Sequence, residues 1–543
     1  MSKTGNEKLI EQLMADGCYY MFGNPGTVEQ GFLDAMGKYE EFHYITCFQE
    51  SIAVAMADGY ARKTGRPTVV QLHSGVGLGN GIGMIYQAMR GHAPLVILAG
   101  EAGIKYDAMD AQMACDLVSM AKPVTKWSGR VTHKDSVLRM VRRAIKIAMT
   151  PPMGPVFLAL PLDILDEINT EPVYPACKIN TKTVMADKKA LKEVANLLAN
   201  AAAPIFIVGD GIDASGASDA LLENAELIGA VVYGADNSVV NFDHSSCLYG
   251  GDLGHMFGEN SRDKVKCADV VLISGTYVFP EVFPCLESPF REDAHIIHID
   301  HNTYEIGKNY RVDIGIAADP DCVLTELAAI IKDILTEDLR YAANERIEKM
   351  RRQKLEQDMS WKENGVFDAF CKRLKEKTGD ELIIFDEALT SSNTLNHYFQ
   401  FSKAGSFFQT RGGSLGVGIP GAMGIKLASP TSTVIGFTGD GGSMYTIQAL
   451  QTASRYNIGA KFVILNNGAY QLLRDNINQY WQEENIKPHE YPDCFSLQPS
   501  VDFVKMAQSM SVKAKRMDKA ERAEECVRWL LEDNMPALLE IAV

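Results

Sequence analysis

Short apolar runs alternate with stretches of helical spacing along almost the whole chain. The runs are continuous rather than alternating, as expected for parallel strands that are buried on both faces. The clearest are TVVQLHS, PLVILAG, PVFLALP, PIFIVGD, DVVLISG, HIIHID, LIIFDE, STVIGFTGD, KFVILNN and ALLEIAV. Strands that alternate with helices predict an α/β protein built on several mostly parallel sheets, each flanked by helices.

Two stretches interrupt this alternation. Residues 164–184 are polar, contain two prolines and lack periodicity, so they predict a linker. Residues 336–365 are densely charged and predict a solvated helical connector. A chain of 543 residues is too long for a single core. We therefore expect three domains, at residues 1–170, 185–335 and 365–543.

A faint internal repeat relates the first domain to the third. Residues 68–100 and 433–467 each contain a strand, a glycine-rich turn, a helix and a strand that ends in Val-Ile-Leu. Such units also resemble one another in unrelated sheets. We favour the interpretation that the first and third domains have the same fold.

Composition limits the partners and the compartment. The chain has 53 Lys and Arg against 69 Asp and Glu, a net charge of −16, which argues against nucleic acids and anionic membranes as partners. The 11 cysteines show no paired metal-ligand spacing and predict reduced thiols. The sequence has no apolar segment of the kind that would predict a membrane span or a leader. We expect a cytoplasmic protein.

The sequence GDGG at 439–442 suggests a site for a metal and a phosphate. Asp440 follows a predicted strand, and Asn466 and Asn467 follow the next one. The carboxyl ends of neighbouring parallel strands meet at one edge, where ligands of such sheets bind. A carboxylate and an amide there suit Mg²⁺, and the glycines let a diphosphate approach the backbone.

A second Gly-Asp-Gly turn, at 209–211, has the same spacing to an asparagine. Asp210 and Asn237 are separated as Asp440 and Asn467 are, so the spacing does not distinguish the two turns. Asp236 precedes Asn237, and further acidic residues follow Asp210. Since these carboxylates would repel a diphosphate, we do not expect metal binding at the second turn.

The stretch GDGGSMYTIQALQTASRYNIGAKFVILNNGAYQ, at 439–471, resembles the signature of thiamine diphosphate-dependent enzymes. The resemblance implies thiamine diphosphate and Mg²⁺ as cofactors. It also implies that Mg²⁺ is held by Asp440, the Asn467 side chain and the Ala469 carbonyl group. The cofactor would further contact Gly441, Gly442, Ser443 and Tyr470.

Two other segments of the third domain resemble this family. GGSLGVGIPGAMG, at 412–424, resembles the segment that supports the cofactor, with Gly413 at its turn and Leu415 as the bulky residue that forces a V-shape. Thr390 and Ser391, in DEALTSSN, are candidates for contact with the diphosphate. The alternatives are a glycine-rich packing turn and helix N-caps, respectively.

The first domain supplies Glu50, in CFQESIAVAMADGYAR at 47–62, just after a predicted strand and at the start of a helix. A glutamate at the start of a helix is also favoured by the helix dipole alone. The resemblance instead implies that Glu50 is the catalytic glutamate, which hydrogen-bonds the aminopyrimidine of the cofactor. Because the diphosphate belongs to the third domain, we expect Glu50 to come from a neighbouring subunit. This predicts a homodimer at least, and family habit suggests a homotetramer.

NPGT, at 24–27, and LHS, at 72–74, resemble the benzoylformate decarboxylase branch of the family. The resemblance implies that Thr27 and His73 are catalytic and manage protons and the substrate carboxylate. A lone histidine at a strand end is more often structural. Acetolactate synthases typically lack this histidine, so its presence argues against the interpretation that the protein is an acetolactate synthase.

The chain departs from this branch around the expected substrate pocket. A second active-site histidine is replaced by Val282, with Glu281 beside it. Polar residues stand where the branch has aromatic ones, namely Asp475, Asn476 and Gln409, with Arg411 nearby. We therefore expect a smaller or more polar 2-oxo acid than an aryl one.

These features predict non-oxidative decarboxylation of a 2-oxo acid to an aldehyde, with carboligase side activity. The main alternative is a carboligase or lyase that makes or cleaves 2-hydroxy ketones. A nucleotide-binding protein that uses residues 207–216 is a weaker alternative, because the G-x-G-x-x-G pattern is absent. A regulatory homologue without activity would not be expected to keep Glu50, His73, Asp440 and Asn467 together. The sequence leaves the particular 2-oxo acid or aldehyde open.

Overall fold

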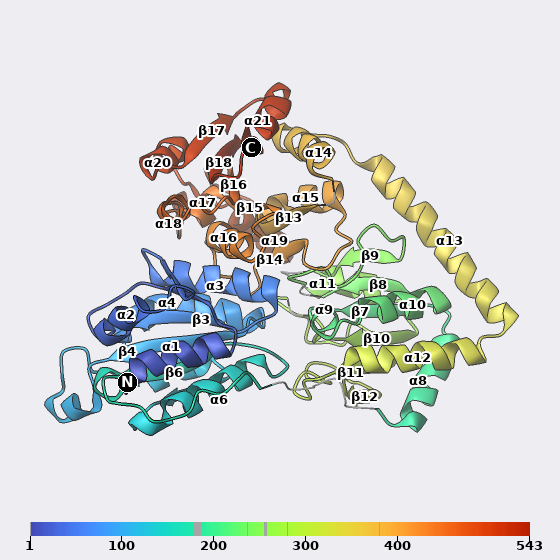
Figure 1. The fold of residues 1–543 in the computed structure, drawn as a ribbon. Helices are drawn as coiled ribbons and strands as arrows, with labels where there is room; N and C mark the ends of the chain where they lie inside the picture. Colours follow the sequence, from blue (N-terminus) through green and yellow to red (C-terminus); the bar gives the residue numbers. More distant parts are fainter. Residues whose placement is uncertain (1, 178–185, 236, 255–257, 280, 380) are drawn as a thin grey trace. The chain divides into compact units, whose positions relative to one another are not determined.

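The computed structural model contains three six-stranded sheets flanked by helices (Figure 1). It describes residues 2–177, 186–235, 237–254, 258–279, 281–379 and 381–543. These residues form two compact units. Of the described residues, the first unit comprises those within 2–177, 363–398 and 410–543, and the second those within 186–362 and 399–409.

The first sheet has the strand order β2-β1-β3-β4-β6-β5, and every neighbouring pair is parallel. Its strands are, in chain order, β1 (Tyr20–Gly23), β2 (His43–Thr46), β3 (Thr68–His73), β4 (Leu95–Glu101), β5 (Trp127–Arg130) and β6 (Val156–Pro161). Its helices are α1 (Gly5–Ala15), α2 (Gln30–Met36), α3 (Glu50–Thr64), α4 (Ser74–Arg90), α5 (Leu117–Ala121), α6 (Val137–Met149) and α7 (Leu162–Leu165), with 3-10 turns η1 (Ile104–Met109), η2 (Lys122–Val124) and η3 (Lys134–Ser136).

The third sheet has the order β14-β13-β15-β16-β18-β17, which repeats the order of the first. Its strands are β13 (Leu382–Glu387), β14 (Phe407–Gln409), β15 (Thr433–Gly439), β16 (Lys461–Asn466), β17 (Lys513–Met517) and β18 (Ala537–Ala542). Its helices are α14 (Val366–Thr378), α15 (Ser392–Phe399), α16 (Gly418–Ala428), α17 (Asp440–Ser443), α18 (Ala449–Arg455), α19 (Gln471–Glu483), α20 (Phe503–Ser509) and α21 (Ala523–Leu530), with η4 (Leu389–Ser391), η5 (Asp493–Phe495) and η6 (Ala520–Arg522). The prediction that the first and third domains are alike is confirmed.

The middle sheet has the order β9-β8-β7-β10-β11-β12 and is parallel throughout. Its strands are β7 (Pro204–Val208), β8 (Val231–Gly234), β9 (Tyr249–Asp252), β10 (Val270–Ser274), β11 (His295–Asp300) and β12 (Ile314–Ala317). Its helices are α8 (Lys188–Ala199), α9 (Gly211–Ser215), α10 (Ser218–Ile228), α11 (Gly258–Val265) and α12 (Pro320–Ile334). The charged stretch forms the long helix α13 (Glu337–Ser360), as predicted (Figure 1).

The cores lie on both faces of the sheets, which explains the continuous apolar runs. The residues of β4, β6, β7 and β10 are all buried. Helices α8, α10 and α12 cover one face of the middle sheet with a single apolar cluster. Such strands place their carboxyl ends, and the turns that follow them, along one edge of each sheet.

Helices α3 and α16 join the first and third domains through glycine contacts. A Cβ on Gly424 would lie 2.0 Å from the carbonyl oxygen of Met56, and one on Gly59 would lie 2.2 Å from that of Gly421. The backbones can approach this closely only because these positions lack side chains.

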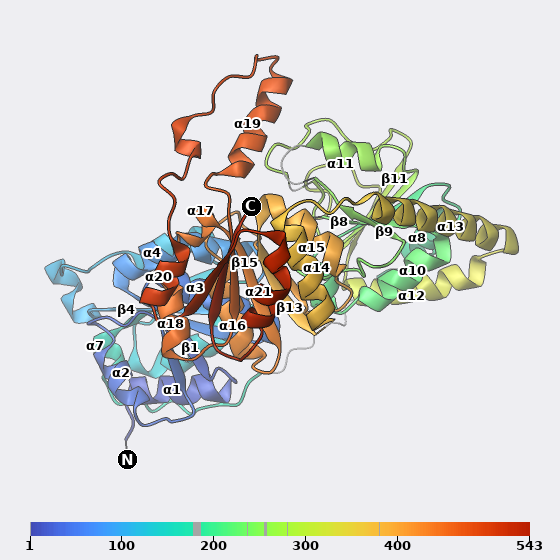
Figure 2. The same ribbon diagram turned by 90° about the horizontal axis from the view of Figure 1, so that it is seen from above.

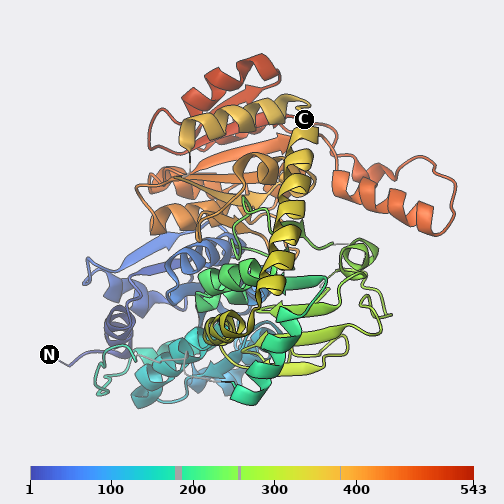
Figure 3. The same ribbon diagram turned by 90° about the vertical axis from the view of Figure 1, so that its right-hand side faces the viewer.

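Helix α19 and the loop that follows it extend away from the rest of their unit (Figures 2 and 3). The base of this arm is fixed to the turn after β16, since Tyr470 N donates to Phe495 O at 2.9 Å and Leu497 N to Gly468 O at 2.9 Å. The arm carries exposed apolar side chains, among them Leu473, Tyr480 and Tyr491.

We predict that Gly424→Ala lowers the melting temperature clearly, because its methyl group would press on the backbone of Met56. Overpacking of this kind costs about 1–3 kcal/mol. Gly83→Ala, at an exposed position of α4, is the matched control, since no atom lies within 4 Å of a Cβ there. Thermal unfolding of both variants checks the prediction. Equal melting temperatures would contradict the glycine contact.

Candidate active site

Glu50 begins α3, four residues after the end of β2, and lies at the carboxyl edge of the first sheet, as predicted. Its side chain is buried. Asn24 Nδ2 donates to Oε1 at 3.2 Å and Asn80 Nδ2 donates to Oε2 at 3.0 Å. The carboxylate is thus fixed by two amides, and the first turn of α3 favours its negative charge.

His73 is the last residue of β3 and lies beside the NPGT turn. A Cβ on Gly26 would fall 2.0 Å from His73 Nδ1, so the turn needs glycine there to accept the imidazole ring. Nδ1 lies 3.0 Å from Glu29 Oε2, which also accepts the N–H of Gly26 at 3.1 Å. Burial raises the pKa of Glu29, and His73 opposes this shift. Thr27 is exposed in the same turn.

The stretch after His73 differs from the prediction. It was expected to form a glycine-rich turn before a helix, but α4 begins at once at Ser74. Ser74 has φ +47°, a left-handed conformation that costs a non-glycine residue about 1–3 kcal/mol. A Cβ on Gly77 would lie 3.4 Å from both Glu50 Oε1 and His73 Cβ. The glycines of α4 therefore let these two side chains lie close to the helix.

In the third domain, Asp440 follows β15 as predicted, and the turn after β16 reaches it. Gly468 N donates to Asp440 Oδ2 at 2.7 Å and Gly441 N donates to Oδ1 at 2.9 Å. Burial raises the pKa of Asp440, while these N–H groups oppose the shift. In the described part of the chain, no lysine, arginine or histidine forms an ion pair with Asp440.

The two asparagines have different environments. Asn466 is buried and donates to Glu540 Oε1 at 2.8 Å, whereas Asn467 is exposed and its Oδ1 accepts the N–H of Ala469 at 2.9 Å. The Tyr470 ring covers Gly441, where a Cβ would lie 2.6 Å from Cε1. Asp440, Asn467, Ala469 and Tyr470 are thus brought together.

The glycine-rich segment 412–418 lies next to this group. Gly413 and Gly416 have φ +76° and +87°, which glycine adopts without strain. Thr446 Oγ1 donates to Gly416 O at 2.7 Å. Leu415, between them, is half-buried. The turn η4, with Thr390 exposed and Ser391 half-buried, lies against α19.

Glu387 is a buried residue of this region that sequence reasoning missed. It ends β13 and pairs in register with Thr438 of β15. Gly416 N and Gly418 N donate to its two carboxylate oxygens, the second at 2.7 Å. Burial raises the pKa of Glu387 to about 7, against the effect of these N–H groups.

Glu29 was missed as well. Its only sequence signal is an acidic residue three positions after the glycine of NPG, and that spacing alone is typical of many helix starts. The signal for Glu387 would have been a glutamate inside an apolar strand run, LIIFDE. A charge at a position buried on both faces requires partners.

Within one chain, the group around Glu50 and His73 lies apart from the group around Asp440 and segment 412–418. The segment 412–414 contacts the far part of α4, where Gly412 N donates to Gln87 Oε1 at 2.5 Å and Ser414 Oγ to Gly83 O at 3.1 Å. His73 precedes α4. At 1.5 Å per helical residue, these contacts lie about 15–20 Å from His73 along the helix. The hydrogen bonds that Glu50 and His73 form with described residues stay within the first domain.

The second Gly-Asp-Gly turn has a packing role. Asp210 accepts hydrogen bonds from Ser238 N at 2.9 Å, from the Ser238 hydroxyl and from Asn241 Nδ2 at 3.0 Å. Gly211 N donates to Gly275 O at 2.9 Å, and a Cβ on Gly211 would lie 2.5 Å from Gly275 Cα. Direct backbone contact therefore closes the place between β7 and β10 where this strand order would hold a ligand. Asp236 lies outside the described residues.

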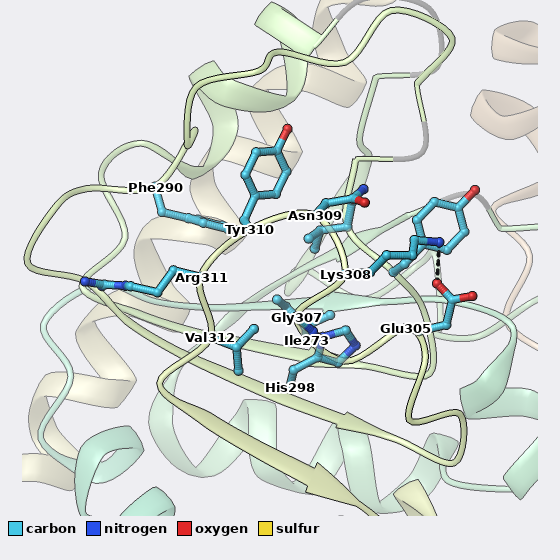
Figure 4. A pocket seen from close by; sticks show the side chains of 12 residues that line it. Ile273, Phe290, His298, Glu305, Gly307, Lys308, Asn309, Tyr310, Arg311 and Val312 are labelled. Atoms are coloured by element: carbon cyan, nitrogen blue, oxygen red, sulfur yellow. Dashed lines mark hydrogen bonds and ion pairs between the residues drawn. The ribbon is translucent and has the colours of Figure 1, made fainter.

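Two further residues named from the sequence, Glu281 and Val282, lie in the middle domain. Val282 is exposed and Glu281 is buried, with Ser261 Oγ bonded to its carboxylate. A pocket between β10, β11 and residues 305–312 is lined mainly by apolar and aromatic side chains, together with a few charged ones that are paired (Figure 4). Lys308 Nζ contacts Glu305 Oε2 at 2.5 Å, and His298 Nε2 contacts Thr276 O at 2.9 Å.

The residues around Asp440 fit a divalent cation and a diphosphate. Asp440, Asn467 and Ala469 offer a carboxylate, an amide and a carbonyl oxygen, the hard donors that Mg²⁺ prefers. Among the described residues no group of three or more His, Cys, Asp and Glu could hold a metal. A buried carboxylate that has no cationic partner among these residues is consistent with a bound cation.

The chain matches the thiamine pyrophosphate enzyme family in all three domains. The match is to its N-terminal TPP binding domain over residues 3–120, its central domain over 191–327 and its C-terminal TPP binding domain over 390–541. The protein belongs to this family. The predicted resemblance and three-domain fold are confirmed.

Relatives include both decarboxylases and synthases. A "probable acetolactate synthase large subunit" of Methanocaldococcus jannaschii is 30% identical over 99% of this chain and 92% of its own length. A benzoylformate decarboxylase of Pseudomonas aeruginosa is 29% identical over 99% and 98%. The structure of a 4-hydroxybenzoylformate decarboxylase of Rhodococcus jostii superposes with a TM-score of 0.86, at 26% identity over 99% of both chains.

These similarities establish a thiamine diphosphate-dependent enzyme of the group that contains decarboxylases and acetolactate synthases. Within the described ranges, no helix is both long and apolar enough to cross a membrane.

Proposed function

We propose that this protein is a thiamine diphosphate- and Mg²⁺-dependent carbon–carbon lyase that decarboxylates a 2-oxo acid to an aldehyde, with carboligase side activity. The observation that carries this proposal is the position of His73 at the carboxyl edge of the first sheet. Its imidazole ring contacts Glu29 and lies close to Glu50. A histidine fixed in this way suits proton transfer at a reacting carbon, which an aldehyde-releasing decarboxylase needs.

In this proposal the residues have separate tasks. Asp440, Asn467 and the Ala469 carbonyl hold Mg²⁺, and Gly441, Gly442, Ser443, Thr390 and Ser391 contact the diphosphate. Gly413, Leu415 and Tyr470 contact the rings. When bound, thiamine diphosphate supplies the electron sink for loss of carbon dioxide. Glu50 exchanges a proton with the aminopyrimidine. Thr27 and His73 manage the protons of the substrate, and His73 also anchors the substrate carboxylate.

The imidazole of His73 is oriented by its partner. With Glu29 ionised, Nδ1–H donates to Glu29 Oε2, so Nε2 is the nitrogen that accepts and returns a proton. Glu29 is therefore a positioning residue for His73. A carboxylate–imidazole pair of this kind keeps one tautomer and one ring orientation.

The substrate in this proposal is a small or polar 2-oxo acid. Asp475 is exposed on α19 and accepts from Gln471 Nε2 at 2.8 Å, so this helix presents charge where an aryl pocket needs apolar surface. The second candidate is carboligation as the main reaction, favoured by the acetolactate synthase relative.

We propose that the protein acts in the cytoplasm. Its proposed partners are small molecules and further copies of the same chain. A homodimer at minimum, or a homotetramer, would complete the site, because one chain keeps Glu50 and His73 apart from segment 412–416. The arm with Leu473, Tyr480 and Tyr491 exposed offers apolar surface to a second copy.

We expect thiamine diphosphate with Mg²⁺ to raise the melting temperature, and either alone to do so less. Ligand at about 100 times its Kd adds about 2.7 kcal/mol to the free energy of unfolding. Asp440→Asn should abolish the rise. Asp210→Asn, at the second Gly-Asp-Gly turn, is the matched control and should keep it. The absence of a shift in the wild-type protein would refute cofactor binding.

Product analysis tests the reaction. Aliphatic, polar and aryl 2-oxo acids are each supplied with and without an added aldehyde. We expect aldehyde and carbon dioxide from a small or polar acid, and some 2-hydroxy ketone when aldehyde is added. A product that is 2-hydroxy ketone alone would favour the carboligase. Phenylglyoxylate as much the best substrate would contradict the polar pocket.

Hybrid dimers test the shared site. Glu50→Gln and Asp440→Asn chains should each be inactive alone. When the two are mixed and exchange subunits, half of the dimers are hybrids with one intact site of two, so about one quarter of wild-type activity should return. Mixing Glu50→Gln with a chain that carries both changes should restore nothing. If each chain held a complete site, neither mixture would regain activity.

A further inference from the structure

We propose that Glu387 is a positioning residue, which fixes the backbone on the C-terminal side of Leu415 and thereby sets how far Leu415 projects into the cofactor site. This inference rests on the proposed function and goes beyond it, since Glu387 itself touches neither substrate nor cofactor in the proposal.

Glu387 lies between the two backbone segments that form the cofactor half of the site. On one side its oxygens accept the N–H groups of Gly416 and Gly418. On the other side Oε1 lies 3.4 Å from the position of a Cβ on Gly442, in the turn that carries Asp440. The side chain is only 1% exposed. A single buried carboxylate thus connects the Leu415 turn to the diphosphate turn.

The contact leaves the turn little freedom. A Cβ on Gly418 would lie 2.9 Å from Glu387 Oε2 and 2.7 Å from Phe437 O, so the N–H group can reach the carboxylate only from a glycine. Gly416 is held at both of its polar atoms, by Glu387 through its N–H and by the Thr446 hydroxyl through its carbonyl. Leu415 is the residue directly before this fixed point.

The N-terminal side of the turn is held by a different domain. Gln87 Oε1 accepts the N–H of Gly412, and a Cβ on Gly412 would lie 2.9 Å from Gln87 Cα. Leu415 therefore projects from a short loop whose two ends are fixed, one by α4 and one by Glu387. Moving either end changes where its half-buried side chain points.

The chemistry requires an ionised or doubly accepting group at this position. Two N–H donors approach two different oxygens, and a carboxylate accepts both. A glutamine of the same size has one oxygen and one NH₂ group, so one backbone N–H would face another donor. The turn must then shift, although the side chain keeps its volume.

The test compares Glu387→Gln with wild type at a pH of about 8, above the pKa of Glu387. The readout is the exchange rate of the C2 proton of bound thiamine diphosphate, followed by NMR after quenching, with saturation confirmed by titration. A displacement of about 1 Å in a supporting residue is expected to slow such a step about 10²-fold. This readout needs no substrate and no turnover.

Three further variants make the result specific. Glu171→Gln is the matched control, because Glu171 is a buried carboxylate whose oxygens accept Leu138 N at 2.8 Å and Arg139 N at 3.2 Å away from the site. It should lower the melting temperature without slowing exchange. Leu415→Ala should slow exchange by itself. In the double variant, Glu387→Gln should add at most about threefold to that effect, since both changes act through one side chain.

Thr446→Val gives a second route if Glu387→Gln does not fold. It removes the hydroxyl that holds Gly416 O without altering a charge, and it should also slow exchange in a way that Leu415→Ala masks. Unchanged exchange in the folded variants, or full additivity with Leu415→Ala, would overturn the positioning role alone. Failure of the wild-type protein to bind thiamine diphosphate would refute the proposed function and this inference together.

Discussion

The close approach of α3 to α16 is the constraint on which the arrangement of the first unit depends. Gly59 and Gly424 let two helix backbones touch, and this contact joins the two sheets that have the same strand order. Glu50 begins one of these helices, and Leu415 lies just before the other. A contact that holds both domains rigidly also fixes the distance between the two groups of site residues within a chain. This connection supports the proposal that a second copy of the chain completes the site.

The two Gly-Asp-Gly turns show how the same local sequence has two outcomes. Both follow a buried parallel strand, and both place an aspartate at the carboxyl edge of a sheet. In the middle domain Ser238 and Asn241 donate hydrogen bonds to the Asp210 carboxylate, and the backbone of Gly275 packs against Gly211. Among the described residues of the third domain, only backbone N–H groups are bonded to the Asp440 carboxylate. The two aspartates differ in their hydrogen-bond partners, which lie far away in the sequence, so the Gly-Asp-Gly motif alone does not distinguish them.

The sequence predicted the interior of each sheet better than its edges. All ten apolar runs correspond to strands, because burial on both faces demands continuous apolar sequence. Five of the six edge strands, namely β5, β9, β12, β14 and β17, were not identified. Strands such as WSGR and YGGD are half-exposed and lack a periodic apolar signal. For the site, the positions of Glu50, His73, Asp440 and Asn467 at strand ends were predicted correctly, since parallel topology alone determines them. The glycine-rich start of α4 was predicted wrongly, because glycine disfavours helices unless close contacts require it.

The buried acids Glu29 and Glu387 were not predicted from the sequence, and their burial has one physical explanation. Each lies at the carboxyl edge of its sheet, is buried, and has a pKa that burial raises. A carboxylate there is unfavourable unless donors from elsewhere in the chain converge on it. The donors are a histidine and a glycine N–H for Glu29, and two glycine N–H groups for Glu387. In both cases the buried acid accepts hydrogen bonds that hold another residue in place. In the proposed site, His73 and Leu415 would therefore be ordered by buried acids whose own positions cost stability, as is typical where a fold has been adapted to precise chemistry.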